Sequence, residues 1–259
     1  MKNFDHRINS DPVRFKYAKG VSLRTGKEFH PYHEIILFLG ERAELFSDSG
    51  HTSVEANTLI VIPRETYHQL NIVGDPEAYH RCVVDFPDLP ELQGLIDQVM
   101  TRLCVSEVSR EVAFLFQKLI KIAENPADPE TDALLLRSCL PLLLSELPRE
   151  GIDWHSDLHP IAARSLSYIN AHLSEELSVE AVARQLNVSA SLLSHAFKKE
   201  MNISFYQYVL KKRLTLAFQR IKEGEPAALV AERCGFHDYS NFYRQYKKAF
   251  GRAPSERNG

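Results

Sequence analysis

The sequence predicts an α+β protein with a β-rich N-terminal part and an all-α C-terminal part that contains two helix-turn-helix motifs. Three observations support this fold class. Short β-branched runs separated by turn residues occupy residues 21–86, which is typical of a small barrel or sandwich. Apolar residues recur with helical spacing from residue 89 onward. One pattern of turn and anchor residues then occurs twice within residues 160–259.

Length and composition favour a protein of the cytosol. The 259 residues are enough for one large or two ordinary domains. Four cysteines without CxxC spacing, Cys82, Cys104, Cys139 and Cys234, predict reduced thiols. No apolar run approaches about 18 residues, and residues 1–10 are too polar for a signal peptide. We therefore expect a cytoplasmic protein that does not contact a membrane.

The charge is distributed unevenly along the chain. The net charge is −3, but residues 160–259 carry 15 basic and 9 acidic side chains, so the rest of the chain has a balance of −9. A basic module joined to an acidic one is typical of a protein whose basic part binds a polyanion. Ordinary surface variation also produces such a difference, so the charge alone decides little.

The N-terminal strands are predicted from three apolar runs. Residues 34–39, 58–62 and 81–86 are rich in β-branched and aromatic side chains, and Pro63 ends the second run. The turn-like residues 47–50 separate the first two. We assign residues 1–86 to this domain.

Residues 87–150 are predicted to be helical, with helices at 89–103, 108–123 and 131–147. Two prolines within residues 125–129 separate the second and third helices. The third is very rich in leucine, which indicates either dimerisation or packing within one chain. Residues 151–160 combine glycine, proline and polar side chains, and residues 151–159 are the predicted linker.

Residues 160–259 are predicted to form an all-α domain. We expect helices at 160–172, 179–186, 190–201, 205–221, 226–234 and 239–250. Ser178 and Ser189 are expected N-caps, because each hydroxyl can accept a hydrogen bond from an unpaired backbone N–H. Asn187 and Gly235 suit the left-handed conformation of the turns between paired helices.

The repeated pattern places the same residue types at offsets of 48 and 49 positions. Ala183 and Ala231 are the small residues at which the two helices of each motif can cross. Apolar side chains on one face of the second helix of each pair are expected to pack in the core. The opposite, polar face is then free to enter the major groove of DNA. The inward anchors are Leu193, Phe197, Phe242 and Tyr246. The candidates for base contacts are Ser191, Ser194, His195, Ser240, Asn241 and Arg244, and those for phosphate contacts are Lys198, Lys199, Lys247 and Lys248. Each polar residue taken alone is equally explained as solvated surface.

Residues 161–257 resemble the DNA-binding domain of AraC/XylS-type transcriptional regulators. The strongest block runs from Cys234 to Phe242, followed by Phe250-Gly251 and Pro254. The resemblance implies that two recognition helices enter successive major grooves and that residues 205–221 hold them apart. His195 stands where the family often has arginine, so we expect Arg244 in the second motif to carry more of the base reading.

Residues 29–35 and 59–68 are similar to the cupin-type effector domain of such regulators, in which a small barrel holds a ligand. The effector-pocket candidates are Arg24, His30, His33, Arg64, Tyr67 and His68. His30, His33 and His68 with Glu34 resemble a cupin metal set, and imidazole and carboxylate groups suit a divalent transition metal. A metal at His30, His33 and His68 is the alternative to a pocket without cofactor, which is the expectation adopted here. No catalytic residues are predicted.

The sequence therefore predicts a ligand-controlled, sequence-specific DNA-binding regulator, by family resemblance usually an activator. Its expected partners are double-stranded DNA, a small-molecule effector of unknown identity, a second copy of the chain in a homodimer, and RNA polymerase as a further candidate. Two alternatives stay open. One is a constitutive DNA-binding protein whose barrel is only a scaffold, and the other is a metal-dependent cupin enzyme.

Overall fold

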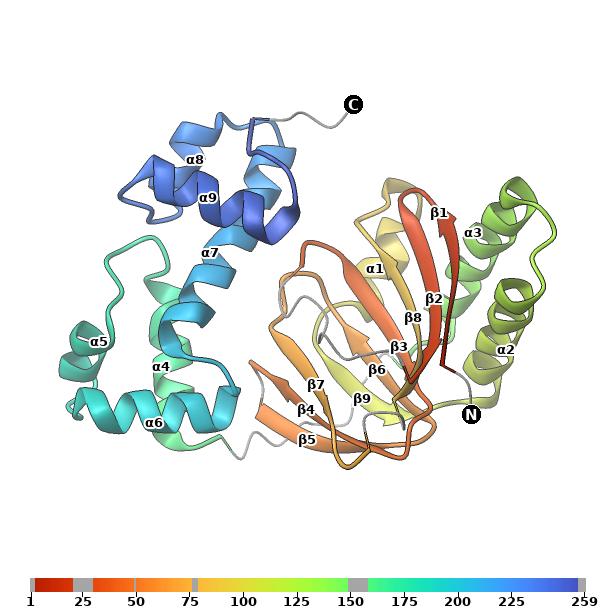
Figure 1. Ribbon diagram of the computed structural model, residues 1–259, viewed down its shortest axis with the longest axis horizontal. Helices are drawn as coiled ribbons and strands as arrows, with labels where there is room; N and C mark the ends of the chain where they lie inside the picture. The colour runs from red at the N-terminus through yellow and green to blue at the C-terminus, as the bar shows by residue number, and fades with distance from the viewer. Residues whose placement is uncertain (1–2, 21–29, 49, 76–78, 149–157, 256–259) are drawn as a thin grey trace. The chain divides into compact units, whose positions relative to one another are not determined.

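The computed structural model describes residues 3–20, 30–48, 50–75, 79–148 and 158–255, and the chain divides into two compact units (Figure 1). The first comprises Met1–Glu28 and Tyr32–Ser156, and the second comprises Phe29–Pro31 and Asp157–Gly259. The first unit is rich in β-sheet and the second is helical, which confirms the predicted mixed fold class. Most of the predicted linker falls on residues 149–157, outside the described residues.

The first unit contains two antiparallel sheets. One has the strand order β1-β2-β8-β3-β6-β9 and the other has the order β5-β4-β7. The strands predicted from apolar runs are β3, β6 and β8, which are neighbours in the middle of the larger sheet. The strands are β1 (Phe4–Ser10), β2 (Val13–Lys19), β3 (His33–Phe38), β4 (Arg42–Ser47), β5 (Gly50–Glu55), β6 (Thr58–Ile62), β7 (His68–Ile72), β8 (His80–Phe86) and β9 (Cys104–Glu107).

The two faces of the larger sheet belong to different cores. Ile36 and Phe38 on β3 pack with residues of the smaller sheet, such as Leu45 and Leu70, in a core enclosed by the two sheets. Leu37, between them in sequence, belongs with Ile35 to a second core that includes residues of α2 (Arg110–Glu124) and α3 (Pro129–Ser145). Successive side chains of a strand point to opposite faces, so the four apolar residues at the end of β3 alternate between the two cores.

Helices cover the outer face of the larger sheet (Figure 1). The segment contains a short 3-10 helix, η2 (Pro90–Leu92), followed by α1 (Gln93–Val99), α2 (Arg110–Glu124) and α3 (Pro129–Ser145). In place of the helix predicted over residues 89–103, the structure has the shorter α1 and the 3-10 helix η2. Residues 104–107 lie between two of the predicted helices and form β9, a strand that was not predicted and that pairs with β6 at the edge of the sheet.

The second unit follows the predicted helices closely. Its helices are α4 (Pro160–Ala171), α5 (Val179–Gln185), α6 (Ala190–Met201), α7 (Phe205–Lys222), α8 (Ala227–Arg233) and α9 (Tyr239–Phe250). Helices α5 and α6 contact each other, as do α8 and α9. All four cysteines are free thiols, as predicted. Within the described residues, no helix combines the length and the apolar content that a membrane crossing requires.

Candidate nucleic-acid interface and effector site

The first helix-turn-helix motif consists of α5 and α6. The predicted caps are confirmed: Ser178 accepts a hydrogen bond from the N–H of Ala181, and Ser189 accepts one from Leu192, both at 3.1 Å. Asn187 has a φ of 56°, the left-handed conformation expected for the turn. Phe197 is fully buried, together with Leu193. The other face of α6 presents the base-contact candidates Ser191, Ser194 and His195, all exposed.

The second motif consists of α8 and α9 and has the same design. Asp238 caps α9 by accepting hydrogen bonds from the N–H groups of Ser240 (2.9 Å) and Asn241 (3.2 Å). Phe242 and Tyr246 are buried, whereas Ser240 and Arg244 are exposed and Asn241 is partly exposed. The cap at Asp238 was not singled out from the sequence, although aspartate before an apolar-periodic segment is a known signal.

The lysine pairs occupy equivalent places in the two motifs. Lys198 and Lys199 lie in the last turn of α6, and Lys247 and Lys248 lie in the last turn of α9. All four are exposed. Cations at a helix C-terminus also interact favourably with the helix dipole, so the exposed side chains are compatible with a purely structural role as well as with phosphate contacts.

One side chain of the central helix joins the two motifs. From α7, Arg213 donates to the carbonyl oxygen of Leu173 (2.9 Å) and to that of Glu175, both in the connection before α5. Its third bond runs to the carbonyl oxygen of Gly235 (2.8 Å), in the turn between α8 and α9. Gly235 has a φ of 79°, and a Cβ there would lie 2.9 Å from the guanidinium carbon. The turn of the second motif is therefore shaped around Arg213.

In the first unit, the effector-pocket candidates divide into two groups because His33 and Glu34 are successive residues of β3. Glu34 lies on the same face as Ile36, toward the core between the sheets, and His33 lies on the opposite face. His68 accompanies Glu34 and Arg64 accompanies His33, whereas the buried His30 is assigned to the second unit. Tyr67 is fully buried and donates to Gln69 (3.3 Å). Arg24 lies outside the described residues.

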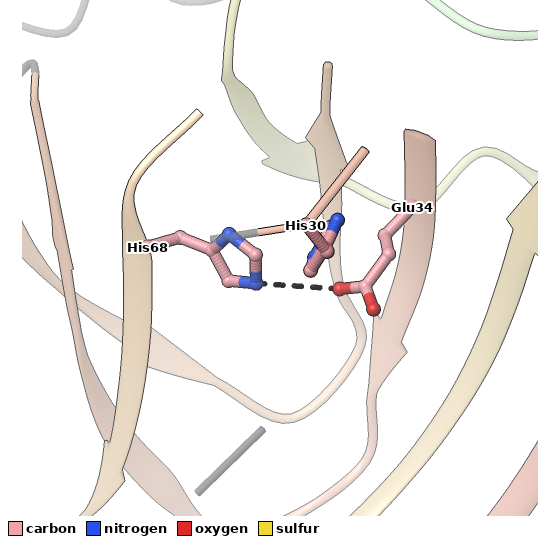
Figure 2. Close-up of side chains that lie close together, drawn as sticks. All are labelled: His30, Glu34 and His68. Carbon is pink, nitrogen blue, oxygen red and sulfur yellow. Dashed lines mark ion pairs between the residues drawn. The ribbon is translucent and has the colours of Figure 1, made fainter. Parts of the chain in front are cut away.

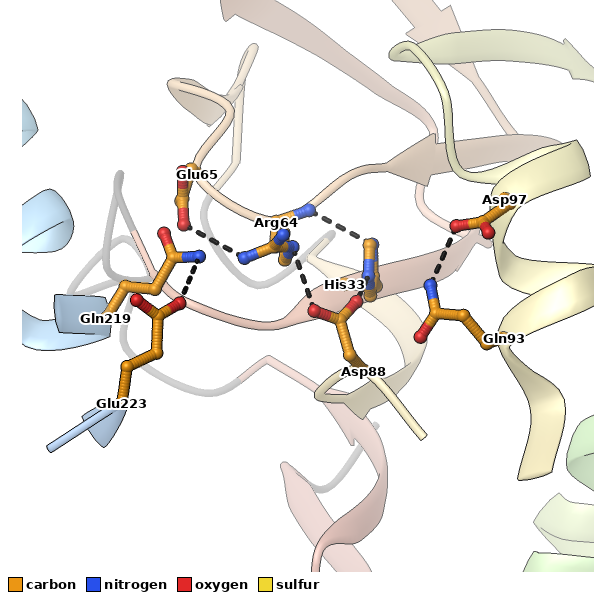
Figure 3. A network of polar contacts seen from close by, with 8 residues as sticks. All are labelled: His33, Arg64, Glu65, Asp88, Gln93, Asp97, Gln219 and Glu223. Carbon is orange, nitrogen blue, oxygen red and sulfur yellow. Dashed lines mark hydrogen bonds and ion pairs between the residues drawn. The ribbon is translucent and has the colours of Figure 1, made fainter. Parts of the chain in front are cut away.

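The group around His33 is a closed polar network (Figure 3). The backbone N–H of Arg64 donates to Nδ1 of His33 (3.1 Å), so Nε2 carries the hydrogen and donates to Asp88 (3.0 Å). The Arg64 guanidinium forms ion pairs with Asp88 (3.2 Å) and with Glu65 (3.2 Å). These residues line a surface pocket together with Gln93 and Asp97 of the helix α1 region. Asp88 was not predicted, since it follows β8 outside any motif.

The group around Glu34 lies at one end of the core between the sheets (Figure 2). Nε2 of His68 is 3.3 Å from a carboxylate oxygen of Glu34. Asp85 of β8 is paired in register with Glu34 and forms an ion pair with Arg14 of β2 (2.5 Å). Burial raises the pKa of Tyr32, and the carboxylates of Glu34 and Asp85 act in the same direction. Asp85 was not predicted, because its position beside Glu34 depends on the pairing of β8 with β3.

Comparisons with known proteins identify the second unit. The sequence profile of a helix-turn-helix domain family matches residues 182–257. The multiple antibiotic resistance protein MarA of Salmonella typhimurium is 34% identical over 90 residues, which cover 34% of this chain and 71% of MarA. The chain belongs to the AraC/XylS family of transcriptional regulators.

Two other members of the AraC/XylS family align with this chain over different lengths. The arabinose operon regulatory protein of Escherichia coli is 30% identical over 201 residues, which cover 74% of this chain and 64% of that protein. The probable transcriptional regulator LumQ of Photobacterium leiognathi is 37% identical over 90 residues, 34% of this chain. The chain spans only 36% of LumQ.

Proposed function

We propose that this chain is a sequence-specific DNA-binding regulator of transcription, located in the cytoplasm, whose N-terminal sheets bind a small-molecule effector. One observation carries the proposal. Two capped helices, α6 and α9, each bury an aromatic anchor and expose a polar face that ends in two lysines. A helix of this kind fits the major groove, with its polar side chains toward the bases and its lysines beside the phosphates.

Selection of bound fragments from genomic DNA, with and without a metabolite extract, tests this proposal. Enrichment of one sequence motif supports specific binding, and a change in enrichment on adding extract supports an effector. Enrichment that is the same in both arms favours the constitutive DNA-binding protein. The absence of any salt-sensitive binding to duplex DNA contradicts the regulator as a whole, because phosphate contacts release counterions and make affinity depend on salt.

Arg244 is the base-reading residue for which we expect the largest loss of binding. It is exposed on α9, whereas Phe242 and Tyr246, two residues before and two residues after it, are buried in the core. Arg244→Ala is expected to cost about 1–3 kcal/mol against the preferred base, and Lys247→Ala is expected to reduce the salt slope by about 1 with little change in sequence preference. Fluorescence anisotropy on the selected fragment, at several salt concentrations, measures both. Equal losses on selected and random DNA for Arg244→Ala would contradict base reading.

We also propose that α3 forms a homodimer interface. Packing within the chain accounts for Leu136, Leu140, Leu143 and Leu144, which are buried, but Leu135 and Leu142 are 40% and 56% exposed. These two leucines are seven residues apart, two helical turns, and so share one face. Packing of this face against the same face of a second copy of the chain would bury both leucines.

Leu135→Asp and Leu142→Asp are expected to weaken dimerisation at least about tenfold each, since burial of a leucine stabilises by about 1.5–3 kcal/mol. Sedimentation equilibrium measures the effect. Arg137→Asp, at an exposed position on a different face of α3, is the matched control. A wild-type chain that sediments as a monomer at all concentrations would contradict this interface.

A further inference from the structure

The second helix of the first motif exposes a leucine in its first turn. Leu192 on α6 is 47% exposed, although the next residue, Leu193, is fully buried. The buried side chains of α6 recur at the spacing of one helix face; they are Leu193, Ala196, Phe197, Glu200 and Met201. Leu192 lies outside that series, so the packing of α6 leaves this apolar side chain in water.

Leu192 shares a face of α6 with candidates for DNA contacts. His195 and Lys199 follow it at intervals of three and seven residues, and all three side chains are exposed. Residues with this spacing are neighbours on the surface of a helix. Ser189, the N-cap, accepts a hydrogen bond from the backbone N–H of Leu192 (3.1 Å), which places Leu192 in the first turn. The N-terminal residues of a recognition helix are those that contact base edges.

The second motif has a different side chain at the equivalent position. Arg244 of α9 stands 49 residues after His195 of α6, and at the same offset Leu192 corresponds to Asn241. Asparagine can form two hydrogen bonds with adenine, whereas an apolar side chain in the major groove contacts the 5-methyl group of thymine. The two helices therefore present different chemistry to the bases at this position.

We propose that Leu192 reads a thymine by contact with its 5-methyl group in the major groove. The inference rests on the proposed function, because it requires α6 to enter the groove of duplex DNA. The contact removes the methyl group and part of the leucine side chain from water, so it favours thymine over bases without that methyl group. Uracil pairs with adenine as thymine does and lacks only the methyl group, so comparison of these two bases isolates the contact.

Replacement of single thymines by uracil in the selected DNA fragment tests this contact. At the thymine that Leu192 contacts, uracil is expected to weaken binding of the wild-type chain about fourfold, the factor that burial of one carbon provides. Leu192→Ala is expected to bind the thymine fragment at least about fourfold more weakly than wild type. A further loss of less than about twofold with uracil is expected in this variant, because the two changes remove the same contact. Fluorescence anisotropy measures all four affinities.

Leu229→Ala is the matched control. Leu229 is also exposed (39%), but it lies on α8, the first helix of the second motif. This variant is expected to keep the wild-type affinity and the wild-type loss with uracil. Circular dichroism melts establish that each variant is folded.

The outcomes separate this inference from the proposed function. If uracil weakens Leu192→Ala as much as wild type at every thymine, Leu192 does not read the methyl group, while the regulator stands. The same conclusion follows if Leu192→Ala loses affinity equally for selected and random DNA, or if the selected motif contains no thymine. The absence of any binding to duplex DNA contradicts both proposals.

Discussion

Arg213→Ala is expected to lower the free energy of unfolding of the helical unit by about 2–4 kcal/mol and to abolish specific DNA binding. The substitution removes three hydrogen bonds from a charged donor and leaves the carbonyl oxygens of Leu173, Glu175 and Gly235 without that partner. Because these carbonyls lie next to different helix-turn-helix motifs, the loss removes the hydrogen bonds that fix the position of both motifs relative to α7. If the separation of the two recognition helices is no longer fixed, binding to both grooves must first order the helices, and the lost conformational entropy weakens the affinity for DNA.

Chemical denaturation and anisotropy with the selected DNA fragment measure these two effects. Arg213→Lys keeps the charge but not the forked geometry of the guanidinium, so we expect a result close to that of alanine. Lys222→Ala removes an equal charge from an exposed position of the same helix and is expected to leave stability within about 0.5 kcal/mol of wild type. If Arg213→Ala binds the fragment as tightly as Lys222→Ala does, Arg213 does not couple the motifs.

Phe242→Ala is expected to have the largest effect on stability, about 3–5 kcal/mol. The ring is fully buried in a core that includes Leu214 of α7 and Val230 of α8. Its centroid lies 5.0 Å from that of Phe236 and 5.4 Å from that of Tyr246. Removing it leaves a cavity beside the second motif and deprives the neighbouring rings of a packing partner.

Hydrogen exchange followed by mass spectrometry locates this effect. Peptides from α8 and α9 are expected to exchange faster in Phe242→Ala, whereas peptides from the β-sheets are expected to exchange at the wild-type rate. Tyr239→Ala, which removes a ring that is 42% exposed on the same helix, is the comparison. Similar exchange in the two variants would show that the buried ring does not anchor α9.

The sequence predicted the helical unit well because its signals are local. Serine caps at Ser178 and Ser189 and the left-handed residues Asn187 and Gly235 fix helix ends through contacts within a few residues. The bounds of α6 and α9 therefore coincide with those expected from the residues alone.

The sheet-rich unit was harder to predict because its structure depends on contacts between distant residues. β9 is four residues long and acquires its conformation by pairing with β6, which no local pattern reveals. Strands β1 and β2 were not predicted individually because polar, exposed side chains alternate with their few buried residues. The candidate pocket residues were found from their residue types. Their division into two groups follows from the alternating directions of successive side chains on β3, which could be assigned only once the pairing of the strands was known.

The pairing of β9 with β6 bears on any attempt to isolate the sheet-rich unit. A fragment ending at Phe86, the boundary suggested by composition, would lack β9 and leave the outer backbone groups of β6 without hydrogen bonds. An unpaired, apolar strand edge is a template for intermolecular association, so such a fragment is expected to aggregate. Because α2 and α3 also pack on β1 and β2, a fragment that keeps the sheet paired and its helical face covered extends through α3.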